Sequence, residues 1–372
     1  MINTTYYQDL TKMNTFGMKV KARCFIEYDS VADLVDIEFG ELARPVLHIG
    51  GGSNLLFTDD FKGTILHSKI NFIEILDDCH FDRAERVEKS VGPVLVSVGA
   101  GVVFDDFCDW AAKEGLWGVE NLSYIPGEVG ASAVQNIGAY GVEVKDVIKT
   151  VYCYDTIDEE FVNFDVEDLD YGYRDSAFKD PEIKGRYVVT HVVFALSRTP
   201  QPKLDYGHLK EAVLAAIPTV ISSPSSVISS EVEKSLTPAL IRKTIIKIRK
   251  DKLPEPSVMG SAGSFFKNPV ISAEHFARIE AAAKAEQGAD YKVPHYDLPD
   301  GTVKVPAAWM IEQCGWKGKR SGGAAVYDKQ PLVIVNYTGE AYPEEIIGLE
   351  RRIIASVKSK FDIILHPEVE HI

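Results

Sequence analysis

At 372 residues the chain is long for a single hydrophobic core, so two or three domains are expected. Hydrophobic residues make up 45% of it and charged residues 26%, as is ordinary for a globular protein in water. The formal net charge of −15 argues against a general nucleic-acid-binding protein, which needs a basic face.

Residues 1–70 alternate short apolar runs with turns, which predicts a small α+β unit with strands near 24–26, 45–49 and 64–66. A run of three glycines, Gly50-Gly51-Gly52-Ser53-Asn54-Leu55-Leu56, follows the second of these strands. Consecutive main-chain N–H groups of such a run can form a nest that binds an anion.

The next unit is expected to begin with a strand over residues 94–98. A helix over about 104–114 follows, because apolar side chains recur on one face and Gly115 can end it. Those apolar residues are Phe104, Phe107, Cys108 and Ala111. Two more strands are expected near 149–154 and 187–196.

Residues 125–141, Ile-Pro-Gly-Glu-Val-Gly-Ala-Ser-Ala-Val-Gln-Asn-Ile-Gly-Ala-Tyr-Gly, form a second glycine-rich run. Glycine admits positive φ and lets a ligand come close to the main chain, so the run predicts a wall of bare N–H and C=O groups. Neither run is a dinucleotide fingerprint or a phosphate loop. The plainer alternative is that the glycines mark turns and packed bulges. Two long runs together favour a cofactor.

Residues 237–251 have the apolar spacing of an amphipathic helix that the following Lys-Leu-Pro-Glu-Pro stops. Basic residues crowd its other face, and a solvated face that aids solubility is the favoured interpretation for most of them. They are Arg242, Lys243, Lys247, Arg249, Lys250 and Lys252.

Beyond Pro254 a helix is expected over 306–314 with proline at its first position, then a strand over 332–336 and a helix from 343 to about 360. This alternation predicts a small α/β layer. The polar segments 77–90 and 222–235 are expected to be mobile surface loops without a catalytic part.

The five cysteines are scattered and form no zinc-binding set with the nine histidines, which fits free thiols in a reducing compartment and no metal. The N-terminus has no basic-then-apolar leader, and no apolar run approaches bilayer length. We expect a cytoplasmic monomer without nucleic-acid or membrane partners.

Both glycine runs resemble the flavin-binding half of UDP-N-acetylenolpyruvoylglucosamine reductase, the second enzyme of peptidoglycan precursor synthesis. The similarity extends from Asn14-Thr15-Phe16 to His366-Pro367-Glu368-Val369, and the chain departs from the family at Ala133, where proline is more usual. The resemblance implies an α+β fold. This fold has a two-part FAD-binding domain of the vanillyl-alcohol-oxidase-like superfamily and a C-terminal α/β substrate-binding domain.

The expected domain boundaries follow from the resemblance. The FAD-binding subdomains would span 1–70 and 71–205, and the tyrosine loop, an insertion and the basic helix would span 206–253. The substrate-binding domain would span 254–362, and residues 363–372 would carry Glu368 back to the active site.

The resemblance implies a flavoprotein oxidoreductase with UDP-N-acetylmuramate dehydrogenase (NADP⁺) activity. It would reduce UDP-N-acetylglucosamine-enolpyruvate to UDP-N-acetylmuramate, with FAD as cofactor and NADPH as co-substrate. The activity serves peptidoglycan synthesis, and through it cell-wall biogenesis, cell shape and cell division.

The family reaction assigns catalytic roles to three residues. Hydride passes from N5 of reduced FAD to the enolpyruvyl carbon, and Ser264 matches the proton donor. Arg174 and Glu368 match residues that stabilise the enolate. Local sequence alone offers a plainer alternative for each residue. Ser264 could belong to a turn or helix cap, and Arg174 could form a surface ion pair with Asp175. Glu368 could be an exposed glutamate near the end of the sequence.

The remaining family contacts divide into cofactor and substrate residues. Tyr206 matches the tyrosine of a loop that closes over the sugar nucleotide, a feature of the type I enzymes, and Tyr173, Lys252, Asn268 and Gln330 match other substrate contacts. His48, His67 and His366 are expected to be structural. The FAD contacts would be Gly50, Gly51, Gly52, Ser53, Asn54, Leu55, Pro126, Gly127, Gly130, Ala131, Gln135, Asn136, Gly138, Ala139, Tyr140 and Gly141.

Two other functions remain open. An FAD-dependent oxidase or dehydrogenase of the same superfamily often tethers its flavin through histidine or cysteine in the first glycine loop, and Gly50–Leu56 contains neither. A regulator that only binds flavin or a sugar nucleotide would not need Ser264, Arg174 and Glu368 together.

Overall fold

The computed structural model describes residues 1–76, 92–217 and 235–372, which form two compact units. The first unit comprises Met1–Gln8, Ala22–Gly51 and Lys62–Asp251, and the second comprises Asp9–Lys21, Gly52–Phe61 and Lys252–Ile372. The loops expected at 77–90 and 222–235 lie outside the described residues, except for Ser235. The five-part division given above stays a prediction.

The first unit contains a four-stranded sheet in the order β1-β2-β5-β3, in which β3 and β5 are parallel. The expected strands are confirmed as β2, β3 and β5, whereas β1 was not predicted because its side chains alternate little in hydrophobicity and are mostly exposed. Ser30 caps the short helix α1 by accepting from the N–H of Asp33. The elements are β1 (Ile2–Asp9), β2 (Lys21–Tyr28), α1 (Val31–Val35), β3 (Val46–Ile49) and β5 (Phe61–Ser68).

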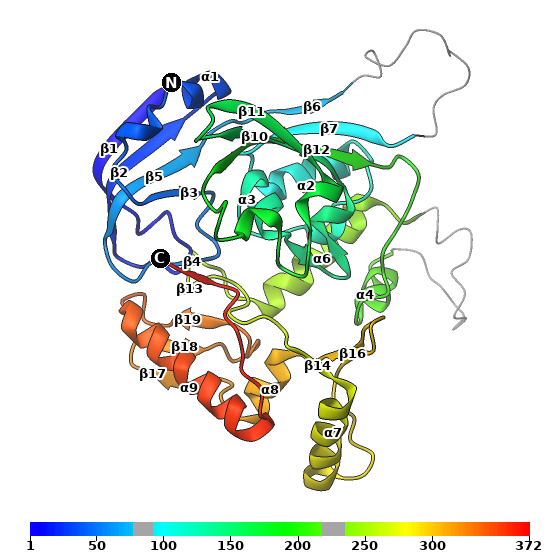
Figure 1. The fold of residues 1–372 in the computed structure, drawn as a ribbon. Coiled ribbons are helices and arrows are strands. Elements are labelled where there is room, and N and C mark those ends of the chain that lie inside the picture. Colours follow the sequence, from blue (N-terminus) through cyan, green and yellow to red (C-terminus); the bar gives the residue numbers. More distant parts are fainter. Residues whose placement is uncertain (77–91, 218–234) are drawn as a thin grey trace. The chain divides into compact units, whose positions relative to one another are not determined.

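A five-stranded antiparallel sheet in the order β11-β10-β12-β7-β6 forms the larger part of the first unit. Helices α2 and α3 cover one of its faces (Figure 1), where Phe107 of α2 packs against Phe194 with ring centroids 4.6 Å apart. All four apolar residues predicted for this face of α2 are buried, as expected. The elements are β6 (Ile73–Ile75), β7 (Val94–Gly99), α2 (Phe104–Lys113), α3 (Val129–Gln135), β10 (Ile148–Asp155), β11 (Glu160–Asp165) and β12 (Tyr187–Leu196).

Helix α3 lies inside the second glycine-rich run, so the prediction of bare main chain is wrong for Val129–Gln135. A Cβ on Gly130 would lie 2.9 Å from the Cβ of Ala100. This glycine therefore permits close packing of the helix against the turn after β7, as the plainer alternative proposed. The main chain leaves the helix at Asn136, whose φ is 45°, and continues into a hairpin of β8 (Gly138–Ala139) and β9 (Val142–Glu143).

The basic helix is confirmed as α6 (Pro238–Lys252), and it packs with α4 (Leu209–Ala215) around Trp117, Ile241 and Ile245. Lys243, Lys247 and Lys250 are exposed, as expected, and so is Lys252, which the resemblance assigns to the substrate. The two arginines are not part of a solvated face: Arg242 pairs with Asp105, and Arg249 donates to a main-chain carbonyl. Helical spacing alone could not separate them from the lysines.

In the second unit, α9 and α8 pack beside a sheet in the order β13-β19-β18-β17, and α7 packs on a smaller sheet in the order β14-β16-β15. Pro306 is the N-cap rather than the first helical residue, because its ψ of 118° is extended. The strand expected over 332–336 begins two residues later, because the carbonyl of Leu332 instead accepts from Phe265. The elements are β4 (Leu55–Leu56), β13 (Gly260–Ser261), β14 (Val270–Ser272), α7 (Ala273–Gln287), β15 (Tyr296–Asp297), β16 (Thr302–Lys304), α8 (Ala307–Gln313), β17 (Arg320–Ser321), β18 (Ala324–Val326), β19 (Ile334–Asn336), α9 (Pro343–Phe361) and β20 (Glu370–His371).

His48 in β3 makes stability depend on pH, because burial lowers the pKa of its imidazole to about 4. The unfolded chain binds a proton at this side chain below about pH 6.5, whereas the folded chain does not until about pH 4. Stability is therefore lost as the pH falls through this window.

We expect the first unit to lose about 2 kcal/mol more unfolding free energy between pH 7.5 and pH 5 than a His48→Leu variant loses. Urea unfolding at the two pH values measures the difference. The other histidines are common to both proteins and serve as the internal control. Equal losses in the two proteins would show that His48 titrates normally in the folded chain.

Candidate functional site

The two glycine-rich runs meet within the first unit, although they lie far apart in the sequence. A Cβ built on Gly51 would lie 3.3 Å from the Cα of Gly127, and one built on Gly50 would lie 3.0 Å from the Cβ of Ala131. At Gly51 main chain therefore packs against main chain, more closely than most side chains allow. Gly51 is exposed and Gly127 is half-buried, so solvent reaches the place where the two runs meet.

A buried polar network of His67, Glu27 and Glu128 lies next to the contact between the two runs. Nε2 of His67 lies 2.9 Å from a carboxylate oxygen of Glu128, and Nδ1 lies 3.3 Å from Glu27. Glu128 directly precedes α3, and its other carboxylate oxygen would lie 3.3 Å from a Cβ on Gly50. His67 is structural, as expected. Glu128 was not predicted, because no local pattern marks a glutamate that pairs with a residue on a distant strand.

Arg174 contacts the second glycine-rich run directly. Its guanidinium donates to the carbonyl of Asn136 at 3.2 Å and to that of Gly138 at 2.5 Å. It also lies 5.5 Å from the ring centroid of Tyr173. The residue has a φ of 55°, in the left-handed region that is uncommon for arginine. The first unit thus brings Arg174, Tyr173 and the predicted flavin residues together.

Asn136 uses its side chain to hold the run in shape. Its amide nitrogen donates to the carbonyl of Gly172 at 2.7 Å and to Glu143 at 3.1 Å, and its oxygen accepts from the N–H of Lys145 at 3.3 Å. Both amide hydrogens are therefore committed to protein partners. Asn136 joins the run to the loop that carries Arg174.

Tyr206 lies beside the end of the same run. Its ring meets that of Tyr140 edge to face with centroids 6.1 Å apart, and a Cβ on Gly141 would lie 3.5 Å from the Cβ of Tyr206. Tyr206 is 43% exposed. Its side chain therefore lies outside the buried core.

In the second unit, the end of the first glycine loop is hydrogen-bonded to the C-terminal segment. Nδ2 of Asn54 donates to the carbonyl of Glu368 at 3.0 Å, and the N–H of Glu370 donates to the carbonyl of Asn54 at 3.0 Å. Strands β4 and β20 continue this pairing in parallel. The loop that begins at Gly52 is thus tied to Glu368.

The segment that contains Ser264 lies beside that of Glu368. The N–H of Glu368 donates to the carbonyl of Phe265 at 2.8 Å, and Phe266 pairs with Pro367 in an antiparallel bridge. Gly263 has a φ of 69°, which turns the chain immediately before Ser264. The second unit therefore brings together Asn54, Ser264 and Glu368.

The other predicted substrate residues occupy separate positions. The amide oxygen of Asn268 accepts from the N–H of Ala307 at 2.9 Å, at the start of α8. Gln330 is half-buried in the turn before β19, and its main-chain carbonyl accepts from Val333. Lys252 is exposed as the last residue of α6. The described residues hold no cluster of three His, Cys, Asp or Glu side chains suited to a metal ion.

Gly138 is expected to be essential for the position of Arg174. A Cβ at this residue would lie 2.8 Å from the guanidinium and 2.9 Å from the carbonyl oxygen of Val142. The second atom belongs to the main chain, so the β8–β9 hairpin would have to shift. We expect Gly138→Ala to lower turnover about tenfold or more, because small displacements of reacting groups have large costs.

Gly40→Ala, in the same unit, is the matched control for this substitution, because a Cβ at Gly40 would meet no atom within 4 Å. Neither Gly138 nor Gly40 has a positive φ, so alanine adds no left-handed backbone strain at either position. Equal turnover by the two variants, each shown to be folded by its melting curve, would argue against a role for the Gly138–Arg174 contact.

Comparison with known proteins matches two parts of the chain to known domain families. Residues 22–164 match the model of an FAD binding domain, and residues 255–372 match that of the UDP-N-acetylenolpyruvoylglucosamine reductase C-terminal domain. The UDP-N-acetylenolpyruvoylglucosamine reductase of Bacteroides fragilis is 47% identical over 366 residues, with 98% of each chain covered. That of Porphyromonas gingivalis is 42% identical over 368 residues, covering 98% of this chain and 97% of its own.

The crystal structure of the same enzyme from Thermus caldophilus superposes with a TM-score of 0.60 at 22% identity. The match covers 100% of this chain and 98% of that one. At this identity the likeness shows the fold alone, and it confirms the expected α+β architecture. The FAD-binding domain confirms the cofactor inferred from the two glycine runs. The chain therefore belongs to the UDP-N-acetylenolpyruvoylglucosamine reductase family of FAD-dependent oxidoreductases.

Proposed function

We propose that this chain reduces the enolpyruvyl ether of UDP-N-acetylglucosamine-enolpyruvate to the lactyl ether of UDP-N-acetylmuramate, with NADPH as the reductant. Family membership over nearly the whole chain supports the substrate. The observation that carries the proposal is the pairing of the Ser264 and Glu368 segments with each other and with the first glycine loop. No local sequence feature requires these three segments to meet.

The residues present fit FAD. A Cβ at Gly50 or Gly51 would press against the second run, so these glycines let the two runs come together, and consecutive main-chain N–H groups of the first run can form a nest for an anion. We assign the pyrophosphate to the first run and the flavin ring to the second. Asn136 would contact FAD by close approach of its main chain rather than by a hydrogen bond, because its amide hydrogens, its N–H and its carbonyl all bind other protein groups. When bound, FAD supplies the hydride chemistry.

Arg174 would bind the substrate carboxylate. As the alkene is reduced, negative charge develops on the enolate and carboxylate, and a fixed guanidinium stabilises it. The two carbonyls of the run hold this guanidinium before substrate arrives, so little reorganisation is needed. Tyr173 would line the same part of the site.

Ser264 would donate the proton to the α carbon. A serine hydroxyl is a weak acid in water, but an enolate is a strong enough base to take a proton from one that is well aligned. The turn at Gly263 and the pairing of Phe265 with Glu368 fix the main chain on both sides of this serine.

Glu368 would act in its protonated form, donating a hydrogen bond to the enolate oxygen. Its main chain is held from two sides, by Asn54 at the carbonyl and by Phe265 at the N–H. This glutamate lies only a few residues from the end of the sequence, and these two bonds keep it in place.

The sugar nucleotide would be bound by Tyr206, Lys252, Asn268 and Gln330. A lysine opposite a diphosphate is electrostatically favourable, and an exposed tyrosine beside Tyr140 could close over the sugar. We further propose that the five domain segments follow the family boundaries and that the protein is a cytoplasmic monomer. Four described cysteines with free thiols support a reducing compartment. None of the described helices is both long and apolar enough to cross a membrane.

The test is an assay of the purified protein for bound flavin and for NADPH oxidation with and without UDP-N-acetylglucosamine-enolpyruvate. NADPH oxidation that requires this substrate supports the proposal. Oxygen consumption on an alcohol would instead indicate an oxidase of the same superfamily. Absence of bound flavin after reconstitution would contradict both.

A further inference from the structure

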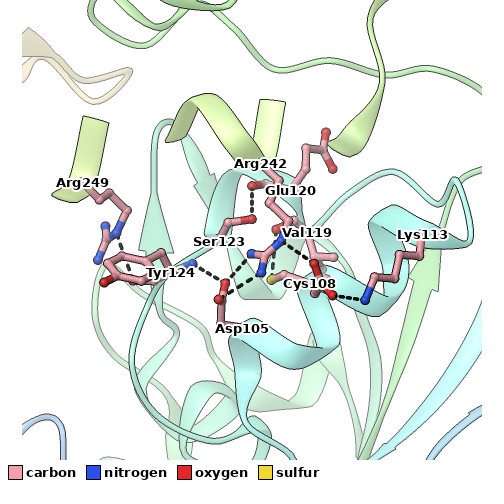
Figure 2. A network of polar contacts seen from close by, with 10 residues as sticks. Asp105, Cys108, Lys113, Val119, Glu120, Ser123, Tyr124, Arg242 and Arg249 are labelled. Carbon is pink, nitrogen blue, oxygen red and sulfur yellow. Dashed lines mark hydrogen bonds and ion pairs between the residues drawn. The ribbon is translucent and has the colours of Figure 1, made fainter. Parts of the chain in front are cut away.

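Tyr124 stands immediately before the second glycine-rich run and has a φ of 62°. This left-handed conformation costs an aromatic residue about 1 to 3 kcal/mol and persists only where its surroundings hold it. Both of its main-chain polar groups are held by charged side chains that converge on it from two helices, α2 and α6 (Figure 2).

The first contact is made through Asp105 of α2. This carboxylate accepts from the N–H of Tyr124 at 2.5 Å, and Arg242 of α6 donates to its two oxygens at 2.5 and 3.0 Å (Figure 2). Arg242 also donates to Asp109 at 3.2 Å, and its side chain is only 11% exposed. A two-pronged hydrogen bond of this kind holds the carboxylate in one orientation and also neutralises its negative charge.

The second contact comes from Arg249, two turns further along α6. Its Nε donates to the carbonyl of Tyr124 at 3.1 Å, and the ammonium of Lys250 lies 5.2 Å from the centroid of the Tyr124 ring. Burial lowers the pKa of Arg249, and the like charge of Arg174 adds to this effect. Burial also raises the pKa of Tyr140 in the glycine run, and the charge of Arg249 partly offsets that rise.

Helix α2, which carries Asp105, is also hydrogen-bonded to the point of contact between the two glycine runs. The carbonyl of Gly127 accepts from the N–H of Phe104, the first residue of α2, at 3.0 Å. Gly127 is also the residue against which Gly51 packs. A change in the pairing of α6 with α2 would therefore shift both Tyr124 and Gly127.

We propose that Arg242 and Arg249 are positioning residues for the second glycine run, Arg242 through Asp105 and Arg249 through the carbonyl of Tyr124. The inference rests on the proposed function, in which this run holds FAD. Neither arginine needs to touch the cofactor. Helix α6 also carries Lys252, so the same helix shapes the flavin surface and ends at a residue assigned to the substrate.

The test compares substitutions within this one helix. Arg242→Met and Arg249→Met are purified alongside Lys243→Met and Lys247→Met, whose side chains are exposed. FAD dissociation constants, release rates, KM and kcat are measured for all of them and for the wild type. We expect both arginine variants to bind FAD at least about tenfold more weakly, or about 1.4 kcal/mol, and both lysine variants to stay within about twofold.

Conservative variants separate positioning from general packing. Arg249→Lys is expected to recover most of the FAD affinity, because lysine can still donate to one carbonyl. Arg242→Lys is expected to recover little, since lysine cannot reproduce the two-pronged bond to Asp105. Simple loss of packing would give the same partial recovery at both positions.

The outcomes also separate this inference from the proposed function. A wild-type protein that binds no FAD would contradict the proposed function. If the wild type binds FAD and turns over, but folded Arg242→Met and Arg249→Met release FAD no faster than Lys243→Met, the positioning role is refuted. Should Arg242→Met fail to fold, Arg249→Met, which loses the hydrogen bonds to the Tyr124 carbonyl and to the Tyr140 side chain, decides the matter.

Discussion

Replacing Ser264 by alanine is expected to leave reduction of bound FAD by NADPH near the wild-type rate. The second half-reaction should slow by about 10²- to 10⁴-fold, the usual contribution of a positioned general acid. The reason is that only the second half-reaction needs a proton at the α carbon. Anaerobic stopped-flow absorbance of the flavin measures the two half-reactions separately.

Ser261→Ala is the control for this experiment, since Ser261 belongs to the same Gly-Ser motif but is buried in β13. It should leave both half-reactions close to wild type. Equal slowing of both half-reactions by Ser264→Ala would mean that the hydroxyl supports the structure of the site rather than proton transfer.

Arg174→Met is expected to lower kcat by about 10²- to 10³-fold, as removal of a fixed donor to a developing negative charge does in other enzymes. It should also weaken substrate binding, because the carboxylate loses its cation. Part of the fall in kcat is expected to come from a change in the second glycine run, because the carbonyls of Asn136 and Gly138 lose their hydrogen-bond donor. The FAD dissociation constant, measured in parallel, reports that part.

Arg198→Met, at an exposed arginine of the same unit, controls for the change in net charge. It should leave kcat and KM unchanged. Arg174→Lys should recover less than half of the lost activation free energy, because lysine cannot hold two carbonyls and a carboxylate in one plane. A kcat for Arg174→Met within a fewfold of wild type would remove Arg174 from the proposed mechanism.

Elements with strong periodicity were predictable from the sequence. Strand β12 has the predicted bounds, and α2 buries the predicted face, because each has a clear apolar period and a turn signal at its end. Helix α7 was missed although its signals are present: Ser272 caps it, and five alanines favour its interior.

Helix α3 could not be predicted, because it lies in a glycine-rich run and such a run suggests irregular main chain. The reason for Gly130 is a tertiary one, the close approach of Ala100. A solvated face was predicted for most of the basic residues of α6, but Arg242 and Arg249 could not be singled out as exceptions, because their partners Asp105 and Tyr124 lie more than a hundred residues earlier. Long-range pairing of charged side chains leaves no trace in helical spacing.

The candidate site was predicted from motifs rather than from spacing. Nothing in the local sequence around Glu368 requires it to pair with Phe265 or with Asn54, so family resemblance alone placed it in the site. Glu128 is the opposite case: it lies in the second glycine-rich run and is buried, but the motif gave no reason to single it out. It became visible only through its contact with His67.

The most direct test of the account is an anaerobic single turnover. The enzyme is reduced with NADPH, freed of excess nucleotide and mixed with UDP-N-acetylglucosamine-enolpyruvate, and the product is identified by mass spectrometry. If the chain catalyses the proposed reaction, the flavin is reoxidised as the lactyl ether, UDP-N-acetylmuramate, appears in an amount equal to the reduced flavin. A flavin that stays reduced while the enolpyruvyl ether is recovered unchanged would contradict it.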